Sequence, residues 1–218
     1  MGNIAEMRSQ LLRLVKQVHG LAERHENKRG ILCTDAPISM AADLYVGEMY
    51  QTLRHELNSV LRGDYSNVNV LIVSAFYGLV QLREGLKEYD LQMGDELADE
   101  TKVYQFWQEQ ALWRLLREYI SEKRVSHVWS LLPNSLQAPY HRVFRFYWNH
   151  MNKQEIKRFH VKVFKEDGLS AGSGSGEKRA EWLREILRAN PDYLTGHPTL
   201  PPPRITSISG FRFGFETC

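Results

Sequence analysis

Apolar side chains recur at helical spacing along much of this chain. One stripe follows residues 4–28, which predicts an amphipathic helix within an N-terminal segment, residues 1–30. The most regular pattern lies in residues 101–122, whose aromatic side chains we expect in the core. In full, the spacing predicts helices at 4–28, 42–61, 101–122, 138–150 and 177–189.

Shorter apolar runs, rich in β-branched and aromatic residues, predict strands between these helices. The first contains Val70–Val73 and ends abruptly at the turn Ser74–Gly78. In full, strands are predicted at 69–74, 126–132, 159–165 and 205–216, with turns at 62–67, a Gly/Ser-rich loop at 168–176 and a Pro-rich loop at 191–204. Strands that alternate with helices predict an α/β protein, a single domain over residues 1–218 with a mixed sheet flanked by helices.

The composition is that of an ordinary globular protein, with 43% hydrophobic and 25% charged residues in a chain of 218. This length is enough for one domain with a substantial core. No apolar run approaches the roughly 20 residues that a membrane span requires, and the N-terminus is polar, so we expect no membrane partner. The two cysteines, Cys33 and Cys218, lie far apart, which favours a reduced, cytoplasmic protein. We expect a monomer.

The net charge of +2 conceals two segments of opposite sign. Residues 84–109 hold eight acids and two bases, whereas residues 141–165 hold seven bases, one acid and three histidines. A basic segment of this density suits a polyanion such as DNA, or the phosphate of a nucleotide. The alternative is a solvated helix face that binds nothing.

Glycine-rich backbone leads into the last predicted helix, in the segment GSGSGEKRAEWLR of Gly172–Arg184. A helix start presents unpaired amides and the positive end of the helix dipole, and Lys178 and Arg179 add charge there. The pattern resembles the hairpin of a helix-hairpin-helix, which holds a DNA phosphate through such amides. Against this, Ser175 is polar where an apolar residue is usual, and a strand precedes the segment. A flexible linker, natural or engineered, is the alternative.

The cations near these two basic regions are the candidates for phosphate contact. They are Arg142, Arg145, Lys157, Arg158, Lys178 and Arg179.

The turn after the first predicted strand offers a hydroxyl, a phenol and a glycine in Ser74, Tyr77 and Gly78. Ligands of open α/β sheets bind at the carboxyl ends of the strands, so these residues are expected to line a pocket for a base, sugar or phosphate. No G-x-S-x-G elbow surrounds Ser74 and no local base activates it, so the catalytic residues stay unknown. The structural alternative is that Ser74 caps the turn and Tyr77 packs against the sheet.

The sequence predicts no metal site and no cofactor. His141, His150 and His160 are nine and ten residues apart, not the three or four that place two ligands on one helix face. We expect these histidines to be exposed or part of the basic patch. The sequence contains no Walker, Rossmann or zinc-finger pattern.

The first predicted strand continues as Ser-Ala-Phe-Tyr-Gly-Leu, and Tyr-Asp-Leu-Gln-Met-Gly follows at Tyr89–Gly94. Together they resemble the core signature of the YaaA (DUF328) peroxide stress proteins. Tyr45, Gly47 and Tyr50 resemble the Tyr-x-Gly-x-x-Tyr segment of that family. Looser matches follow at Leu131–Ser135 with Tyr140, at Val161–Phe164 and at Gly176–Ala180, so the colinear resemblance spans about residues 40–190.

Three departures mark the chain as a divergent or truncated relative. The opening family strand with Ser-Pro-Ala-Lys has no counterpart here. Ala138 and Pro139 stand where an acidic residue is expected before Tyr140, and Glu181 stands where the Lys-Ala-Arg-Gly element has glycine. What the resemblance implies is a compact mixed α/β fold with a positively charged groove, DNA binding, and a role in limiting oxidative DNA damage.

Two functional hypotheses follow. The first is a non-catalytic DNA-binding protein of the peroxide stress response, which binds duplex or branched DNA in a basic groove. The alternative is an enzyme that acts on a nucleotide or nucleoside in a pocket at the end of the central strand, with Asn134 facing the turn. Both require the late cations to lie beside Ser74–Gly78. The expected pocket residues are Tyr45, Gly47, Ser74, Tyr77, Gly78, Tyr89 and Asn134.

Overall fold

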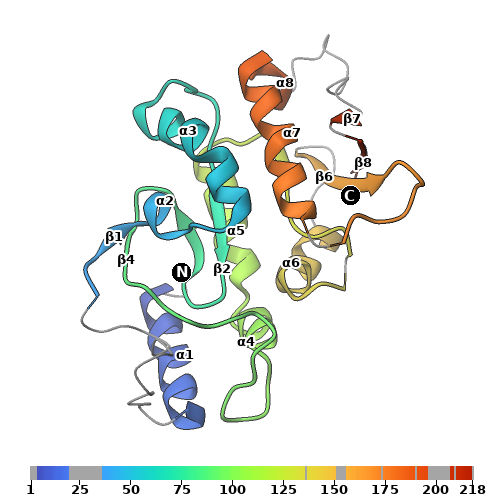
Figure 1. Ribbon diagram of the computed structural model, residues 1–218. Helices are drawn as coiled ribbons and strands as arrows, with labels where there is room; N and C mark the ends of the chain where they lie inside the picture. The colour runs from blue at the N-terminus through green and yellow to red at the C-terminus, as the bar shows by residue number, and fades with distance from the viewer. Residues whose placement is uncertain are drawn as a thin grey trace.

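A computed structural model describes residues 4–19, 36–135, 137–150, 156–172, 174–189, 191–195, 207–208 and 210–217. Within these ranges an N-terminal part of helices and two short two-stranded sheets packs against a C-terminal part that contains a four-stranded sheet (Figure 1). The α/β class with helices around a mixed sheet, predicted from the alternating patterns, is confirmed. No described helix is long and apolar enough to cross a membrane.

The N-terminal part contains five helices and two two-stranded antiparallel sheets among its described residues. The elements are α1 (Ile4–His19), β1 (Ser39–Met40), α2 (Ala41–Leu44), α3 (Glu48–Arg62), β2 (Leu71–Ser74), β3 (Gly78–Gln81), β4 (Gly85–Leu86), α4 (Val103–Glu109) and α5 (Leu112–Glu122). β1 pairs antiparallel with β4, and β2 pairs antiparallel with β3. α1 confirms the predicted N-terminal helix, although residues 20–35, including Cys33, lie outside the described part.

Two of the predicted helices are each interrupted. The helix expected at 42–61 is α2 followed by α3, which ends at Gly63 in the left-handed conformation with φ +89°. The helix expected at 101–122 is α4 followed by α5, and the break lies at Ala111, whose φ is +52°. Most aromatic side chains of this region are buried in the core, as the helical pattern predicted.

The C-terminal part holds the larger sheet and the helices that cover it. Its elements are β5 (His127–Ser130), α6 (Pro139–His150), β6 (Lys157–Lys165), α7 (Ser175–Ala189), α8 (Asp192–Thr195), β7 (Ser207–Ile208) and β8 (Phe211–Thr217). The strand order is β5-β6-β8-β7, with β5 parallel to β6 and the other pairs antiparallel. The strand predicted at 205–216 is divided into two strands, β7 and β8, which pair antiparallel. The Pro-rich loop from residue 196 and Cys218 lie outside the described part.

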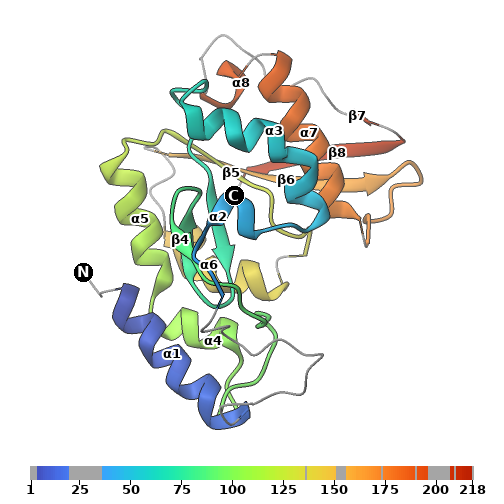
Figure 2. The ribbon, with the colours of Figure 1, turned by 60° about the vertical axis from the view of Figure 1, so that its left-hand side comes forward.

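The two faces of this sheet pack against different helices because side chains alternate along each strand. Trp129 of β5 stacks on Phe159 of β6 with ring centroids 4.3 Å apart, and Trp182 of α7 packs against Trp129. His160, the next residue along β6, contacts His141 of α6 on the opposite face. Helix α7 also lies beside α3, which joins the two parts of the molecule (Figures 1 and 2).

One prediction about the first strand is wrong. β2 does not lie in the four-stranded sheet with its turn at the sheet edge; it forms a separate antiparallel hairpin with β3. Ser74 pairs with Gly78 across a three-residue loop, and Gly78 adopts φ +73°, the left-handed conformation that this kind of hairpin uses. A Cβ at Gly78 would lie 3.0 Å from Leu112 and 3.1 Å from Trp107, so glycine is also required for space.

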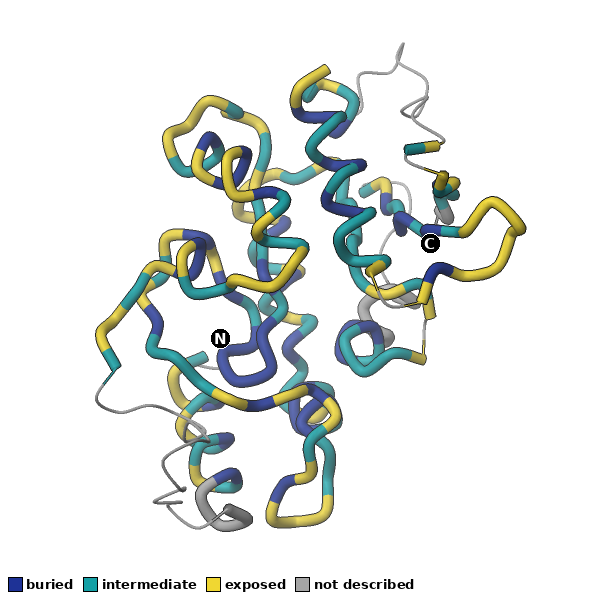
Figure 3. The backbone as a smooth tube through the Cα atoms, viewed as in Figure 1, coloured by how far each residue is buried: buried dark blue, intermediate teal, exposed yellow. Residues whose placement is uncertain are grey.

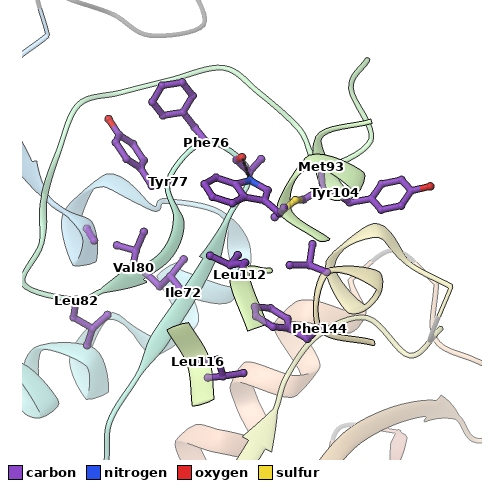
Figure 4. Close-up of a cluster of buried hydrophobic side chains, with 14 of the residues drawn as sticks. Ile72, Phe76, Tyr77, Val80, Leu82, Met93, Tyr104, Leu112, Leu116 and Phe144 are labelled. Atoms are coloured by element: carbon purple, nitrogen blue, oxygen red, sulfur yellow. Dashed lines mark hydrogen bonds between the residues drawn. The ribbon is translucent and has the colours of Figure 1, made fainter. Parts of the chain in front are cut away.

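The hairpin turn is buried at the centre of the molecule (Figure 3). Ile72 and Val80 of the hairpin and Leu112 and Leu116 of α5 point into one hydrophobic cluster, shown in Figure 4. The Trp107 indole, fully buried, donates a hydrogen bond of 2.7 Å to the Ala75 carbonyl within the turn. The turn is therefore part of the core and is held there by α4 and α5.

Candidate functional site

Three hydroxyl groups meet at the end of β2. The Ser74 Oγ lies 2.8 Å from the Tyr89 hydroxyl, and the Tyr45 hydroxyl lies 3.3 Å from that same atom. They come from three separate segments: the end of β2, the link between α2 and α3, and the segment after β4. The structure therefore brings together three of the residues that the sequence placed in a pocket.

Aromatic rings enclose this hydroxyl cluster of Tyr45, Ser74 and Tyr89. Tyr77 packs edge-on against Tyr89 at 5.4 Å, and Tyr50 lies 5.4 Å from Tyr45. Burial raises the pKa of Tyr45 and of Tyr50 far above the usual value, so both phenols stay protonated. The three hydroxyl groups therefore lie among packed aromatic side chains.

Ser74 has the contacts of a structural residue. It is 1% exposed, and its Oγ accepts a hydrogen bond of 3.0 Å from the Tyr77 amide. Among the described residues it forms no hydrogen bond with a histidine or a carboxylate, which a serine nucleophile needs for activation. The Tyr77 hydroxyl donates a hydrogen bond of 2.9 Å to the Lys87 carbonyl and accepts one of 3.0 Å from the Lys87 amide. This agrees with the structural alternative for Ser74 and Tyr77.

Three other residues expected in the pocket, Gly47, Gly78 and Asn134, make their contacts elsewhere and not with the hydroxyl cluster. Gly47 is exposed at the start of α3, and Gly78 is enclosed by Trp107 and Leu112. Asn134 was expected to face the turn, but its side chain bonds to the backbone of Val163. Its Oδ1 accepts a hydrogen bond of 3.0 Å from the Val163 N–H, and its Nδ2 donates one of 2.6 Å to the Val163 carbonyl. The reason is that residue 134 follows β5, which pairs with β6 in the sheet that does not include β2.

Asn134 instead accepts a hydrogen bond from Arg179, a buried cation of α7. Arg179 is 2% exposed, and its three nitrogens donate to neutral oxygens: Val161 O at 3.0 Å, Ser175 Oγ at 3.2 Å and Asn134 Oδ1 at 2.6 Å. No carboxylate of the described residues forms an ion pair with it. Burial lowers the pKa of Arg179 to about 10, so the side chain remains positively charged at neutral pH.

His141 lies on the first turn of α6, within electrostatic range of this cation. It is 3% exposed, its Nε2 lies 2.6 Å from the Pro133 carbonyl, and its ring packs at right angles to that of His160, 4.5 Å away. The His141 Nδ1 is buried and has no hydrogen-bond partner among the described residues. The expectation that His141 and His160 are exposed is therefore wrong, because α6 packs directly on the sheet.

The pKa of His141 is lowered to about 4. Desolvation is the main cause, followed by the charge of His160; the Pro133 carbonyl opposes the shift, and Arg179 and Lys162 add to it. His141 is therefore neutral at pH 7, and protonation would place a further cation beside Arg179.

We expect this histidine to make stability depend on pH. The folded pKa of about 4 lies below the ordinary value of 6.5, so the unfolded chain binds more protons and stability is lost as pH falls from about 6.5 towards 4. At about 1.4 kcal/mol per pKa unit, wild type should lose about 2–3 kcal/mol between pH 7.5 and 4.5 through this group alone. Urea unfolding of wild type and His141→Gln measures the difference. Parallel pH curves for the two proteins would contradict it.

The first turn of α6 connects the hydroxyl cluster with the Arg179 region. Burial raises the pKa of Tyr140, and Tyr89 is the next cause of that shift, so Tyr140 lies near the hydroxyl cluster. His141 contacts the His160 ring and the Pro133 carbonyl, and Arg142 donates a hydrogen bond of 2.7 Å to the Tyr104 hydroxyl. Successive helical residues point about 100° apart, which explains why neighbours in sequence reach different clusters.

The candidate phosphate contacts differ widely in exposure. Lys157 is exposed, whereas Arg158 is 4% exposed, and Arg179 is buried as described above. Lys178 is partly buried, pairs with Glu181 at 2.8 Å and lies over the Phe211 ring. The Arg145 side chain lies outside the described part. An open basic groove therefore cannot use Arg158 and Arg179 as surface contacts in this conformation.

The structure does not form a helix-hairpin-helix at the Gly-rich segment. A strand, β6, precedes it, and Phe164 and Ser170 form an isolated bridge before α7 begins. Among the described residues no group of three or more histidine, cysteine, aspartate or glutamate side chains is placed to hold a metal ion.

The two polar residues whose burial the sequence analysis missed, Arg179 and His160, share one signal. Arg179 precedes Trp182, Leu183 and Ile186 at intervals of three, four and seven, so it lies on the apolar stripe of α7. His160 likewise occupies a buried position in the middle of β6, a strand that is covered on both faces. A polar residue at an apolar position of a periodic pattern is the sequence sign of a buried polar group.

A family comparison identifies the class of protein. The profile of the family described as Peroxide stress protein YaaA matches residues 5–173. The match covers well over half of the chain, so the chain belongs to this family, which acts in the peroxide stress response. A comparison with curated proteins gives no match.

Proposed function

We propose that this protein acts in the peroxide stress response by binding DNA through its phosphates, without catalysing a reaction on it. The single observation that carries the proposal is Arg179, an interior cation at the start of a helix whose hydrogen-bond partners are all neutral. A buried charge is ordinarily paired with an opposite charge or a ligand. An anion that approaches the start of α7 would supply that charge.

The surrounding charges support the choice of a polyanion. Lys162 and His160 belong to β6 and stand near His141, and Lys157 is exposed at the beginning of the same strand. Lys178 is adjacent to Arg179 on α7. Neutralisation of phosphates by such cations releases counterions, so binding should weaken steeply with salt and depend little on sequence.

The hydroxyl cluster favours a binding role over catalysis. An enzyme that acts on a nucleotide needs a pocket of several hundred cubic ångströms at its reacting groups. Beside Ser74 the Tyr89 and Tyr45 hydroxyls are engaged in contacts of 2.8 and 3.3 Å, and the Tyr77 ring packs against Tyr89. These contacts give the tyrosines a structural role between the hairpin and the start of α3, and the proposal places the binding surface at α7.

The salt dependence of DNA binding tests this proposal. The double variant Lys157→Ala with Lys178→Ala should weaken binding of duplex and four-way-junction DNA alike and make the slope of log K against log salt shallower by about 2. The matched control is Lys102→Ala with Lys123→Ala, which removes two cations from the N-terminal part, where they pair with Glu96 and Glu122. Fluorescence anisotropy from 50 to 300 mM salt measures both.

Two results would refute the proposal. One is equal affinity and slope for both double variants. The other is a thermal-shift screen in which mononucleotides stabilise the protein at low concentration while neither DNA binds, which would favour the nucleotide enzyme.

A further inference from the structure

The outer face of helix α5 carries positive charge alone. Arg114 and Arg117 are exposed, and at 100° per residue they share one sector of the helix, about 100° wide, with Trp113 and Ser121. No acidic residue of α5 falls within this sector. The helix lies along one edge of the molecule, apart from the start of α7 (Figure 2). This face is therefore a separate cationic surface.

The two arginines of this face have no acidic partner. Among the described residues neither Arg114 nor Arg117 forms an ion pair, whereas Lys123, just beyond the same helix, pairs with Glu122 at 2.9 Å. Glu118 lies four residues after Arg114, a spacing at which helix residues can pair. It does not pair with Arg114, and its Oε2 is buried with no hydrogen-bond partner in the described part of the chain. The charge of this face is therefore not neutralised within the described structure.

The helix itself gains nothing from this arrangement. Arg114 lies in the first turn of α5, which has no acidic residue, and the positive end of the helix dipole disfavours a cation there. Arg117 follows three residues later on the same side, so the two like charges repel each other. A negatively charged partner bound at this face would offset both costs.

Trp113 restrains both guanidinium groups. The Arg114 Cζ lies 5.4 Å from the centre of the Trp113 ring and the Arg117 Cζ lies 5.3 Å from it, within the range of a cation–π contact. The side chains of the two arginines form no hydrogen bond within the described ranges, so their N–H groups are available to an acceptor. Arginines that are held in place with free donors are suited to bidentate binding of phosphate.

Further positive charge follows the end of the helix. Arg124 is exposed and adopts φ +51°, at a position after a helix that glycine commonly occupies. The Ser126 carbonyl then accepts a hydrogen bond of 2.9 Å from the amide of Lys157, which is exposed. Burial lowers the pKa of His127, and the charge of Lys157 is the second cause. The chain after α5 therefore leads to a lysine that is already a candidate phosphate contact.

We infer that Arg114 and Arg117, positioned by Trp113, form a second surface that binds the phosphates of a DNA strand. The inference goes beyond the proposed function, which places binding at α7, and rests on it only in that the partner is DNA. From Arg114 to the end of α5 the helix rises about 12 Å, at 1.5 Å per residue. A DNA strand rises about 3.4 Å per nucleotide, so the phosphates of about three or four nucleotides lie within this length.

The double variant Arg114→Gln with Arg117→Gln tests the inference. It should weaken binding of duplex DNA by about tenfold at about 100 mM salt and make the slope of log K against log salt shallower by about 2, measured by fluorescence anisotropy. Its melting temperature should stay the same or rise, because the variant removes two like charges from one helix face. The matched control is Arg13→Gln with Arg62→Gln, which removes the same charge from exposed arginines of α1 and α3.

A third variant separates the role of the ring from that of the charges. Trp113→Leu keeps an apolar side chain and both arginines but removes the cation–π contacts, so the affinity should fall by about threefold while the salt slope stays that of wild type. Trp113 packs against the core, and if Trp113→Leu does not fold, the exposed arginine pair still decides.

The outcomes distinguish this inference from the proposed function. If wild type binds DNA and the Arg114 and Arg117 double variant matches its control in affinity and slope, the α5 surface is excluded and the proposed function stands. If wild type binds no DNA, both are overturned. If the α5 variant weakens binding while Lys178→Ala does not, the α5 surface is supported and the placement of the site at α7 is wrong.

Discussion

Trp107→Ala is expected to lower the free energy of unfolding by about 3–5 kcal/mol, the largest stability change that we predict. The indole is fully buried between α5 and the β2–β3 hairpin, and it touches the position of Gly78. Its Nε1 donates to the Ala75 carbonyl at 2.7 Å. Truncation would leave a cavity and an unpaired carbonyl inside the turn. Urea unfolding followed by circular dichroism measures the change.

The matched control is Trp107→Phe, which keeps an aromatic ring but removes the hydrogen bond to Ala75. It should cost about 1–2 kcal/mol, because a smaller ring fills most of the space and one buried acceptor is lost. A loss below about 1 kcal/mol for Trp107→Ala would show that the turn is not held by α4 as described.

Arg179→Met is expected to weaken DNA binding by about tenfold to hundredfold with little change in stability. The affinity change follows from the loss of a positive charge beneath the surface that the DNA phosphates approach, and a tenfold to hundredfold change corresponds to about 1.4–2.8 kcal/mol. Stability should change by less than about 2 kcal/mol, because removal of a buried charge without an acidic partner offsets the three hydrogen bonds that are lost.

Anisotropy titrations and urea unfolding of the same preparation separate the two effects of Arg179→Met. The affinity of the folded variant is compared with that of Lys102→Ala, in which an exposed cation of the N-terminal part is removed. Unchanged DNA affinity in a folded Arg179→Met protein would exclude Arg179 from the binding site.

The sequence predicted most elements of this fold because their patterns are local. The apolar stripe of 101–122 identified α4 and α5, although the break at Ala111 depends on tertiary packing. The strand before Ser74 was identified, but not its partner. A β-branched run looks the same in a buried parallel strand and in a buried hairpin, and only Gly78, with its positive φ, marks the tight turn.

The candidate site was predictable in part. The family signature placed Tyr45, Ser74 and Tyr89 in one pocket, and the structure does bring their hydroxyls together. The sequence could not show that aromatic rings pack around these hydroxyls, because the packing depends on segments far apart in the chain. Arg179 was found from its place at a helix start, but its burial follows from the face of α7 that meets the sheet.

Amide chemical shifts in the presence of a short DNA duplex test the central claim most directly. The account predicts that the amides of Gly174–Lys178 and the Arg179 Nε–H resonance shift with a common affinity, and that this affinity falls steeply as salt is raised. Changes confined to other surfaces, or an affinity that does not depend on salt, would contradict the claim that DNA phosphates bind at the start of α7.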